Sequence, residues 1–210
     1  MKTRSQQTQS FVGTVIARIH GHRGGWVFTP KDFADLADPR CVGVVLTRLV
    51  RKGAIRKLAR GLYDYPIDRP TLGRIAPSVD AIAKAIARRD AVRVQPSGAY
   101  AANLAGLSDQ VPMKVEFLTD GRYRRIKVGN QEIVFKRTTA RNMATTGRKS
   151  GTFIQALRYL GQRHVDDKAI SKLSRQIKDT DRRQLRMDLR YAPAWVASIM
   201  GRLAMGKGSR

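Results

Sequence analysis

The sequence predicts an α+β protein in which a winged helix-turn-helix domain, residues 1–68, precedes a second α+β domain, residues 69–210. Three observations lead to this fold class. Two capped helices with almost no loop between them are followed by a basic hairpin; short apolar runs then alternate with turn signals; and the last part of the chain, from about residue 138 to 210, has helical spacing. We expect a small antiparallel sheet in the second domain, with the helical segment after it.

The first helix is expected over Phe11–His20, because its apolar residues recur on one side. Residues 26–28 form a short apolar run that is expected to join the hairpin as a strand. Another helix is expected to begin at Pro30 and to continue to about residue 37. Thr29 is a typical N-cap, Pro30 suits the first helical position, and Asp32 stands at the third position, as in a capping box.

A further capped helix is expected from Pro39 to about Lys52. Asp38 before Pro39 repeats the N-cap device, and Gly53 is a typical residue just beyond a helix C-terminus. The short connection to the preceding helix is the one that a helix-turn-helix requires.

The two faces of this helix differ in chemistry. One face is apolar and should pack on a core: Val42, Val45, Leu46 and Leu49. The other side carries the candidate DNA-binding residues Arg40, Val44, Thr47, Arg48, Arg51 and Lys52. Guanidinium, hydroxyl and methyl groups are those that contact phosphates, guanine edges and thymine methyls in a major groove.

The hairpin is expected from Ile55 to Tyr65, with its turn near residues 60–61. Its cations Arg56, Lys57 and Arg60 should project from it as in the wing of a winged helix, and they complete the candidate DNA-binding set. The plainer alternative, an amphipathic helix whose basic face is only solvated, stays open from the helix alone.

The second domain is expected to follow a proline-rich linker over residues 66–77. Its expected helices cover residues 79–90, capped by Ser78, and 96–107. A strand is expected at 92–95, and three antiparallel strands at 115–118, 125–128 and 133–136. Helices fill the last segment, which Pro193 interrupts.

The composition favours a polyanionic partner. Lys and Arg total 41 against 16 Asp and Glu, a net charge of +25, while 42% hydrophobic residues are typical of a folded chain. The single cysteine, Cys41, rules out an internal disulfide and suits a reducing cytoplasm. No signal peptide or apolar span indicates a membrane partner.

No pattern in the sequence indicates catalysis, a metal or a cofactor. His20, His22, His164 and Cys41 lack metal-ligand spacing. The acid pairs Asp166–Asp167 and Asp179/Asp181 each lie beside a helix start, where N-capping explains them better than acid–base chemistry. We therefore expect a protein that is not an enzyme.

A basic stripe marks the C-terminal segment. Arg182, Arg186 and Arg190 repeat at helical spacing with Arg183 beside them, and like charges so placed repel one another. The stripe is a candidate second nucleic-acid surface. A solvated face and a site for an acidic protein partner are the alternatives.

The N-terminal motif LTRLVRKGAIRKLARGLYDYP resembles the N-terminal domain of AbiEi-type antitoxins, the antitoxin half of abortive-infection (type IV) toxin–antitoxin pairs. The similarity rests on a recognition helix that ends in basic residues and glycine, a basic strand, and a Gly-aliphatic-Tyr segment. The matching residues are Leu46, Leu49, Arg51, Lys52, Gly53, Arg56, Arg60, Gly61 and Tyr63. The small-residue run from Ser97 to Leu107 is similar to a helix of that family's second domain.

This resemblance implies a cytoplasmic repressor that binds operator repeats in the double-stranded DNA of its own operon, as a monomer in solution or cooperatively on DNA. It also implies a nucleotidyltransferase-type toxin as direct or indirect partner, and no catalytic residue. A stand-alone transcriptional regulator, an RNA-binding or ribosome-associated basic protein, and a nucleic-acid enzyme that only docks its substrate here are the alternatives.

Overall fold

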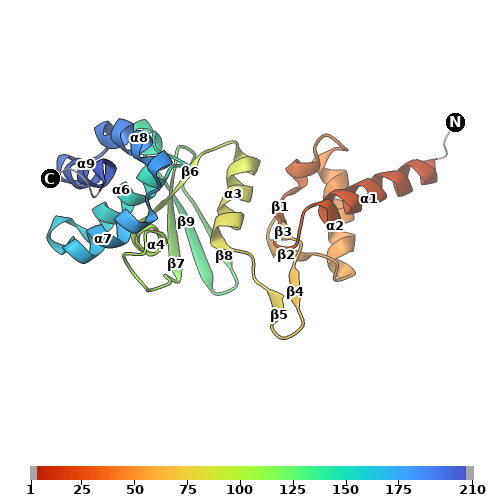
Figure 1. Ribbon diagram of the computed structural model, residues 1–210. Coiled ribbons are helices and arrows are strands. Elements are labelled where there is room, and N and C mark those ends of the chain that lie inside the picture. The colour runs from red at the N-terminus through yellow and green to blue at the C-terminus, as the bar shows by residue number, and fades with distance from the viewer. Residues whose placement is uncertain (1–3, 207–210) are drawn as a thin grey trace. The chain divides into compact units, whose positions relative to one another are not determined.

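The chain forms two compact units that divide after Ala91 in a computed structural model, which describes residues 4–206 (Figure 1). Both units combine helices with small sheets, so the predicted α+β class is confirmed. The division comes later than the boundary after residue 68 that we expected. The reason is that Arg56 donates hydrogen bonds to the carbonyls of Arg74 and Ile75, and Arg88 to that of Val27, so residues 69–91 belong with the first unit.

The first unit begins with a helix and a small sheet. Its elements in order are α1 (Arg4–Gly21), β1 (Val27–Phe28), the 3-10 helix η1 (Pro30–Phe33), α2 (Pro39–Arg51), β2 (Arg56–Ala59) and β3 (Leu62–Asp64). The strands pair antiparallel in the order β1-β3-β2. Phe28, Phe33 and Leu46 are fully buried between the helices and this sheet. The expected first helix, the strand at residues 26–28, α2 and the hairpin are thereby confirmed.

Two expectations for this unit are wrong. The helix expected over residues 30–37 is a single turn of 3-10 helix, since only Phe33 is fully buried and Asp35 turns outward to Arg18. The linker expected over residues 66–77 instead folds as a hairpin of β4 (Ile67–Arg69) and β5 (Gly73–Ile75). The expected next helix is confirmed as α3 (Val79–Asp90), where the Ser78 hydroxyl accepts a hydrogen bond from the Ala81 amide at 3.1 Å.

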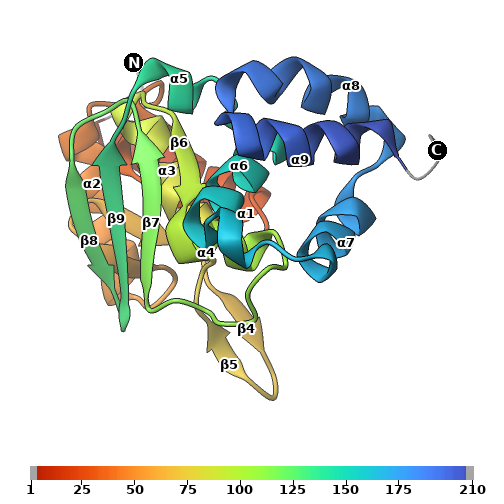
Figure 2. The same ribbon diagram turned by 90° about the vertical axis from the view of Figure 1, so that its left-hand side faces the viewer.

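A four-stranded mixed sheet forms the second unit's centre. The strands β6 (Val94–Ser97), β7 (Lys114–Thr119), β8 (Arg124–Val128) and β9 (Gln131–Arg137) lie in the order β6-β7-β9-β8 (Figure 2). The expectation of three antiparallel strands is wrong, because β9 inserts between β7 and β8 and pairs parallel with β7, with Phe117 opposite Phe135. Only the β8–β9 hairpin is antiparallel among these three.

Helices complete the second unit, as expected: α4 (Gly98–Leu104), α5 (Ala140–Met143), α6 (Lys149–Leu160), α7 (Asp167–Gln176), α8 (Asp179–Asp188) and α9 (Ala194–Met205), with 3-10 turns η2 (Gln162–His164) and η3 (Leu189–Tyr191). The helix expected over residues 96–107 is shorter because residues 96–97 end β6. Pro193 caps α9 and separates it from α8, as expected. None of the helices in residues 4–206 is long and apolar enough to cross a bilayer.

Candidate nucleic-acid interface

The helix α2 is built as the sequence predicts. Its N-terminus is closed by the Asp38 carboxylate, which accepts a hydrogen bond from the Arg40 amide at 2.8 Å. Beyond its C-terminus, Gly53 adopts a φ of 71°, a left-handed conformation that favours glycine. The predicted apolar face, Val42, Val45, Leu46 and Leu49, is buried. These contacts fix which side of α2 faces solvent.

The outer side of α2 is exposed in full, and we call it the α2 surface. It consists of Arg40, Val44, Thr47, Arg48, Arg51 and Lys52. Val44 is 54% exposed among the cations, a methyl-bearing side chain with no core contact. The Thr47 hydroxyl donates to the Gly43 carbonyl at 2.8 Å, so its oxygen is left to accept and its methyl to make apolar contacts.

The β2–β3 hairpin packs on the same core as α2. Gly61, at its turn, has a φ of 67°, and Tyr63 is buried with its ring stacked on Phe28 at 6.2 Å. Lys57 and Arg60 are exposed, as the sequence predicts. Because one core holds both elements, these two cations and the α2 surface are carried by a single rigid support.

Arg56 differs from its expected role on this hairpin. Its guanidinium donates two hydrogen bonds to the carboxylate of Asp64, at 2.5 and 3.0 Å, and Asp64 is fully buried. The bond to Asp64 raises the pKa of Arg56. A third bond reaches the carbonyl of Ile75 at 2.6 Å. Arg56 therefore supports the fold, and among the predicted DNA-binding cations between residues 40 and 60 it is the one whose side chain makes internal hydrogen bonds.

Most acids of the first unit form ion pairs away from the α2 surface, and Asp38 lies at its edge as the N-cap of α2. Residues 39–63 contain no Asp or Glu. Elsewhere, Asp35 pairs with Arg18 and Asp64 pairs with Arg56. Asp68 pairs with Arg74, and Asp32 pairs with Arg88. The hydrogen bond from Arg18 lowers the pKa of Asp35.

Within residues 4–206, none of the acids forms an ion pair with a cation of the α2 surface or with Lys57 or Arg60. Cations without neighbouring acids produce a positive potential that attracts polyanions.

The predicted C-terminal basic stripe is largely used within the fold. Arg182 donates to the Leu203 carbonyl at 2.9 Å and Arg186 to the Ala204 carbonyl at 3.3 Å, so both cap the last turn of α9. Arg190 falls in η3 beyond the end of α8, where its guanidinium lies 4.9 Å from the Tyr191 ring centroid. Arg183 is exposed. The four side chains thus do not form one continuous free face.

Residues weighed for metal binding or catalysis have structural contacts. His22 stacks on Trp26 with centroids 3.8 Å apart. Asp166 caps α7 by accepting from the Ala169 amide at 2.8 Å, as expected for that pair. For the other pair, Lys178 is the N-cap of α8, and Asp181 accepts from the Lys178 amide at 2.9 Å. No group of three or more metal-ligating side chains gathers in the described part of the chain.

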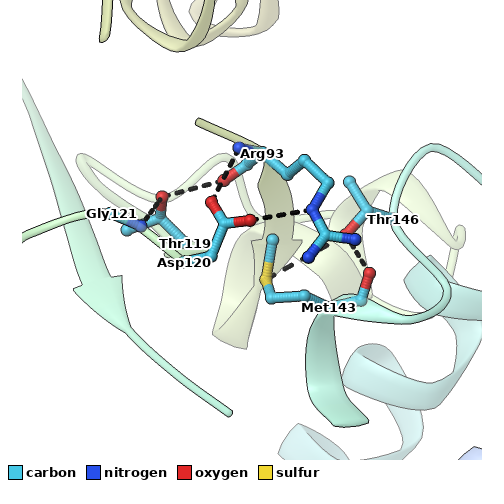
Figure 3. Close-up of polar contacts among 6 residues, drawn as sticks. All are labelled: Arg93, Thr119, Asp120, Gly121, Met143 and Thr146. Carbon is cyan, nitrogen blue, oxygen red and sulfur yellow. Dashed lines mark hydrogen bonds and ion pairs between the residues drawn. The ribbon is translucent and has the colours of Figure 1, made fainter. Parts of the chain in front are cut away.

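A polar cluster that the sequence did not predict joins the ends of β6 and β7. Arg93 donates to both carboxylate oxygens of Asp120, through its amide and its Nε, each at 2.8 Å, and the Thr119 hydroxyl donates to the Arg93 carbonyl (Figure 3). Burial raises the pKa of Asp120, but the bonds from Arg93 outweigh it and leave the pKa below its ordinary value. These bonds hold the loop that follows β7; they place no reactive group beside a cavity.

Comparison with known proteins gives one family. Residues 14–185 match a family of unknown function, DUF6088. The chain belongs to this family. The match begins in α1 and ends in α8, so it includes the α2 surface, both hairpins of the first unit and the mixed sheet of the second. No curated protein matches the chain.

Proposed function

We propose that the first unit is a winged helix-turn-helix that binds duplex DNA, with α2 in the major groove and the β2–β3 hairpin as the wing. The α2 surface is the observation that carries this proposal. Its cations form no ion pair among the described residues, an exposed valine lies among them, and the opposite face of the same helix is buried. A major groove about 12 Å wide admits one α-helix presented in this way.

Each side chain has a distinct part in this proposal. Arg48 and Arg51 both lie in the last turn of α2, and their planar guanidiniums suit bidentate bonds to guanine O6 and N7. Val44 supplies apolar contact to a thymine methyl. Lys57 and Arg60 contact phosphates and fix the register of the protein on the duplex.

We further propose that the protein represses its own operon as an AbiEi-like antitoxin. The recognition-helix and Gly-aliphatic-Tyr residues from Leu46 to Tyr63 support this step through the resemblance they carry. The second unit would then act against a nucleotidyltransferase-type toxin. Co-expression with an adjacent gene of that type tests it: growth rescue that needs the second unit supports the antitoxin role, and no rescue leaves a stand-alone regulator.

An RNA-binding role is the second candidate, favoured by the net charge of +25, which exceeds what one recognition helix needs. Competition between duplex DNA and structured RNA at near-physiological salt separates the two. Binding that RNA removes and DNA does not would replace the DNA proposal.

The deciding experiment selects bound duplexes from a random-sequence pool and footprints the protein on the selected duplex. We expect a protected site, and a loss of about 1–3 kcal/mol with relaxed specificity for Arg48→Ala or Arg51→Ala. Lys57→Ala and Arg60→Ala should weaken binding to all sequences alike and lower the salt slope by about one. Lys84→Ala, which removes an exposed charge from α3, is the matched control.

Diffuse binding with no enriched sequence would count against recognition by α2. The spacing of protected half-sites would also reveal whether one chain or two bind together.

A further inference from the structure

The β4–β5 hairpin is a two-stranded projection within the first unit. Its strands are antiparallel with Asp68 opposite Arg74 and Arg69 opposite Gly73, and residues 70–72 form the tip. It stands out from the three-stranded sheet of the first unit (Figure 1). An isolated two-stranded hairpin is marginally stable in water, so its base must be held by other contacts.

Contacts on two sides hold the base of this hairpin. Arg56 of β2 donates to the carbonyls of Arg74 and Ile75, at 3.5 and 2.6 Å, while it remains paired with buried Asp64. On the other strand, Ile67 packs against Gly24, where an added Cβ would lie 3.0 Å from the Ile67 side chain and 3.1 Å from the Pro66 carbonyl oxygen. The hairpin is therefore fixed relative to β2, the strand that carries Lys57.

The tip combines apolar and basic side chains. Leu72 is 76% exposed, and Arg69 and Arg74 flank it. Arg74 pairs with Asp68 at 3.2 Å across the hairpin, whereas Arg69 has no ion-pair partner among the described residues. One exposed leucine is ordinary on a protein surface. Here it lies two residues after Pro70, between Arg69 and Arg74 in the sequence, at the tip of a hairpin whose base is held by hydrogen bonds.

We propose that this tip enters the minor groove beside the major groove occupied by α2, with Arg69 in the groove and Leu72 as a wedge against a base step. The inference rests on the DNA-binding function proposed above. Minor-groove proteins pair arginines, drawn by the negative potential of the groove, with apolar side chains that partly unstack the bases. The hydrogen bonds from Arg56 to the Arg74 and Ile75 carbonyls hold this second contact in a fixed position relative to the wing.

The hairpin's charge and anchoring favour DNA over a protein partner for the tip. With Asp68 paired to Arg74, the unbalanced charge of the hairpin is positive and belongs to Arg69. The anchoring residue, Arg56, belongs to the strand that also presents Lys57. Because Arg56 also holds the base of the β4–β5 hairpin, the tip and the wing are carried by one support, and in this proposal both contact the same duplex.

Hydroxyl-radical footprinting on the selected duplex tests the inference, because the radical cleaves from the minor groove. We expect wild-type protein to protect a minor-groove segment beside the site read by α2. Leu72→Ala and Arg69→Ala should each remove that protection and lower affinity about tenfold, and Arg69→Ala should also reduce the salt slope by about one. Guanine N7 protection in the major groove should persist in both variants.

Thr71→Ala is the matched control, since it changes the same exposed turn without touching the wedge or the charge. Unchanged thermal unfolding of all three variants shows that the hairpin still folds. Equal footprints and affinities for wild type, Leu72→Ala and Arg69→Ala overturn the inference while leaving the DNA-binding function intact. Absence of any selected duplex for the wild type overturns both.

Discussion

The α2 surface and the α8–α9 region are both rich in arginine, yet their arginines do different work. On α2 the guanidiniums of Arg48 and Arg51 face solvent with no described acid paired to them. In the second unit, Arg182 and Arg186 cap α9, and Arg148 pairs with buried Asp188 at 2.7 Å. The comparison teaches that the number of positive charges in a segment does not indicate a binding surface; the number left without internal partners does.

Two charge-matched double variants are the strongest way to break this comparison. Arg48→Ala with Arg51→Ala should weaken binding to the selected duplex by about 2–6 kcal/mol in total, at about 1–3 kcal/mol for each arginine. Unfolding should change little, because both side chains are exposed. Arg182→Ala with Arg186→Ala removes the same charge but should instead destabilise the second unit by about 1–3 kcal/mol through lost carbonyl bonds.

Affinity measured by fluorescence anisotropy and stability measured by urea unfolding distinguish the two pairs. If the Arg182 and Arg186 pair weakened DNA binding as much as the α2 pair, the C-terminal stripe would be a binding surface after all.

Arg56 and Lys57 allow the same comparison, between a cation with internal partners and an exposed one, within a single hairpin. Arg56→Gln leaves the fully buried Asp64 carboxylate without its ion-pair partner, so we expect the first unit to lose about 3 kcal/mol of unfolding free energy. Lys57→Ala, one residue away and exposed, should change stability by less than about 0.5 kcal/mol. Urea unfolding followed by Trp26 fluorescence measures both. Similar stabilities for the two variants would contradict the structural role of Arg56.

Lowering the pH should destabilise the second unit through its ion pairs, by less than the substitutions above. The Asp181 carboxylate accepts from Lys149 Nζ at 2.5 Å and from the Lys178 amide at 2.9 Å, and the Lys149 bond lowers its pKa below the ordinary 3.8. A carboxylate with a lowered pKa in the folded state stabilises the fold above the unfolded pKa. That stability disappears as pH falls through the folded value.

The melting temperatures of wild type and Asp181→Asn, compared from pH 7 to pH 3, test this sign. Their difference should be largest at neutral pH and should shrink below about pH 4. Asp179→Asn is the control, because that carboxylate is 95% exposed. A difference that grows on acidification would contradict the assignment.

Local signals predicted α2 and its surroundings well. Asp38–Pro39, Gly53 and Arg60–Gly61 each determine backbone geometry within a few residues, so the helix bounds, the buried face and the hairpin turn were confirmed. The parallel pairing of β7 with β9 could not be predicted, because it depends on β9 entering between two strands that precede it in sequence. No local pattern carries that information.

Arg56 was misassigned for a specific physical reason. A two-residue turn at residues 60–61 would place Lys57 opposite Asp64. The observed register shifts between Lys57 and Ala59, and Arg56 becomes the partner of Asp64 instead. A bulge of one residue exchanges the two faces of a strand, so it reverses which cation is buried. Asp64 is visible in the sequence, but its burial depends on this register.

The order in which the two units leave the ribosome follows from the division after Ala91. The hydrogen bonds that join η1 and β1 to α3, and β2 to β5, connect residues that precede this point. At translation rates of ~5–20 residues per second, the rest of the chain follows over an interval on the order of ten seconds. A nascent chain can thus present its α2 surface before the mixed sheet exists, and a message broken shortly after the codon for Ala91 would yield a fragment with that surface and no second unit.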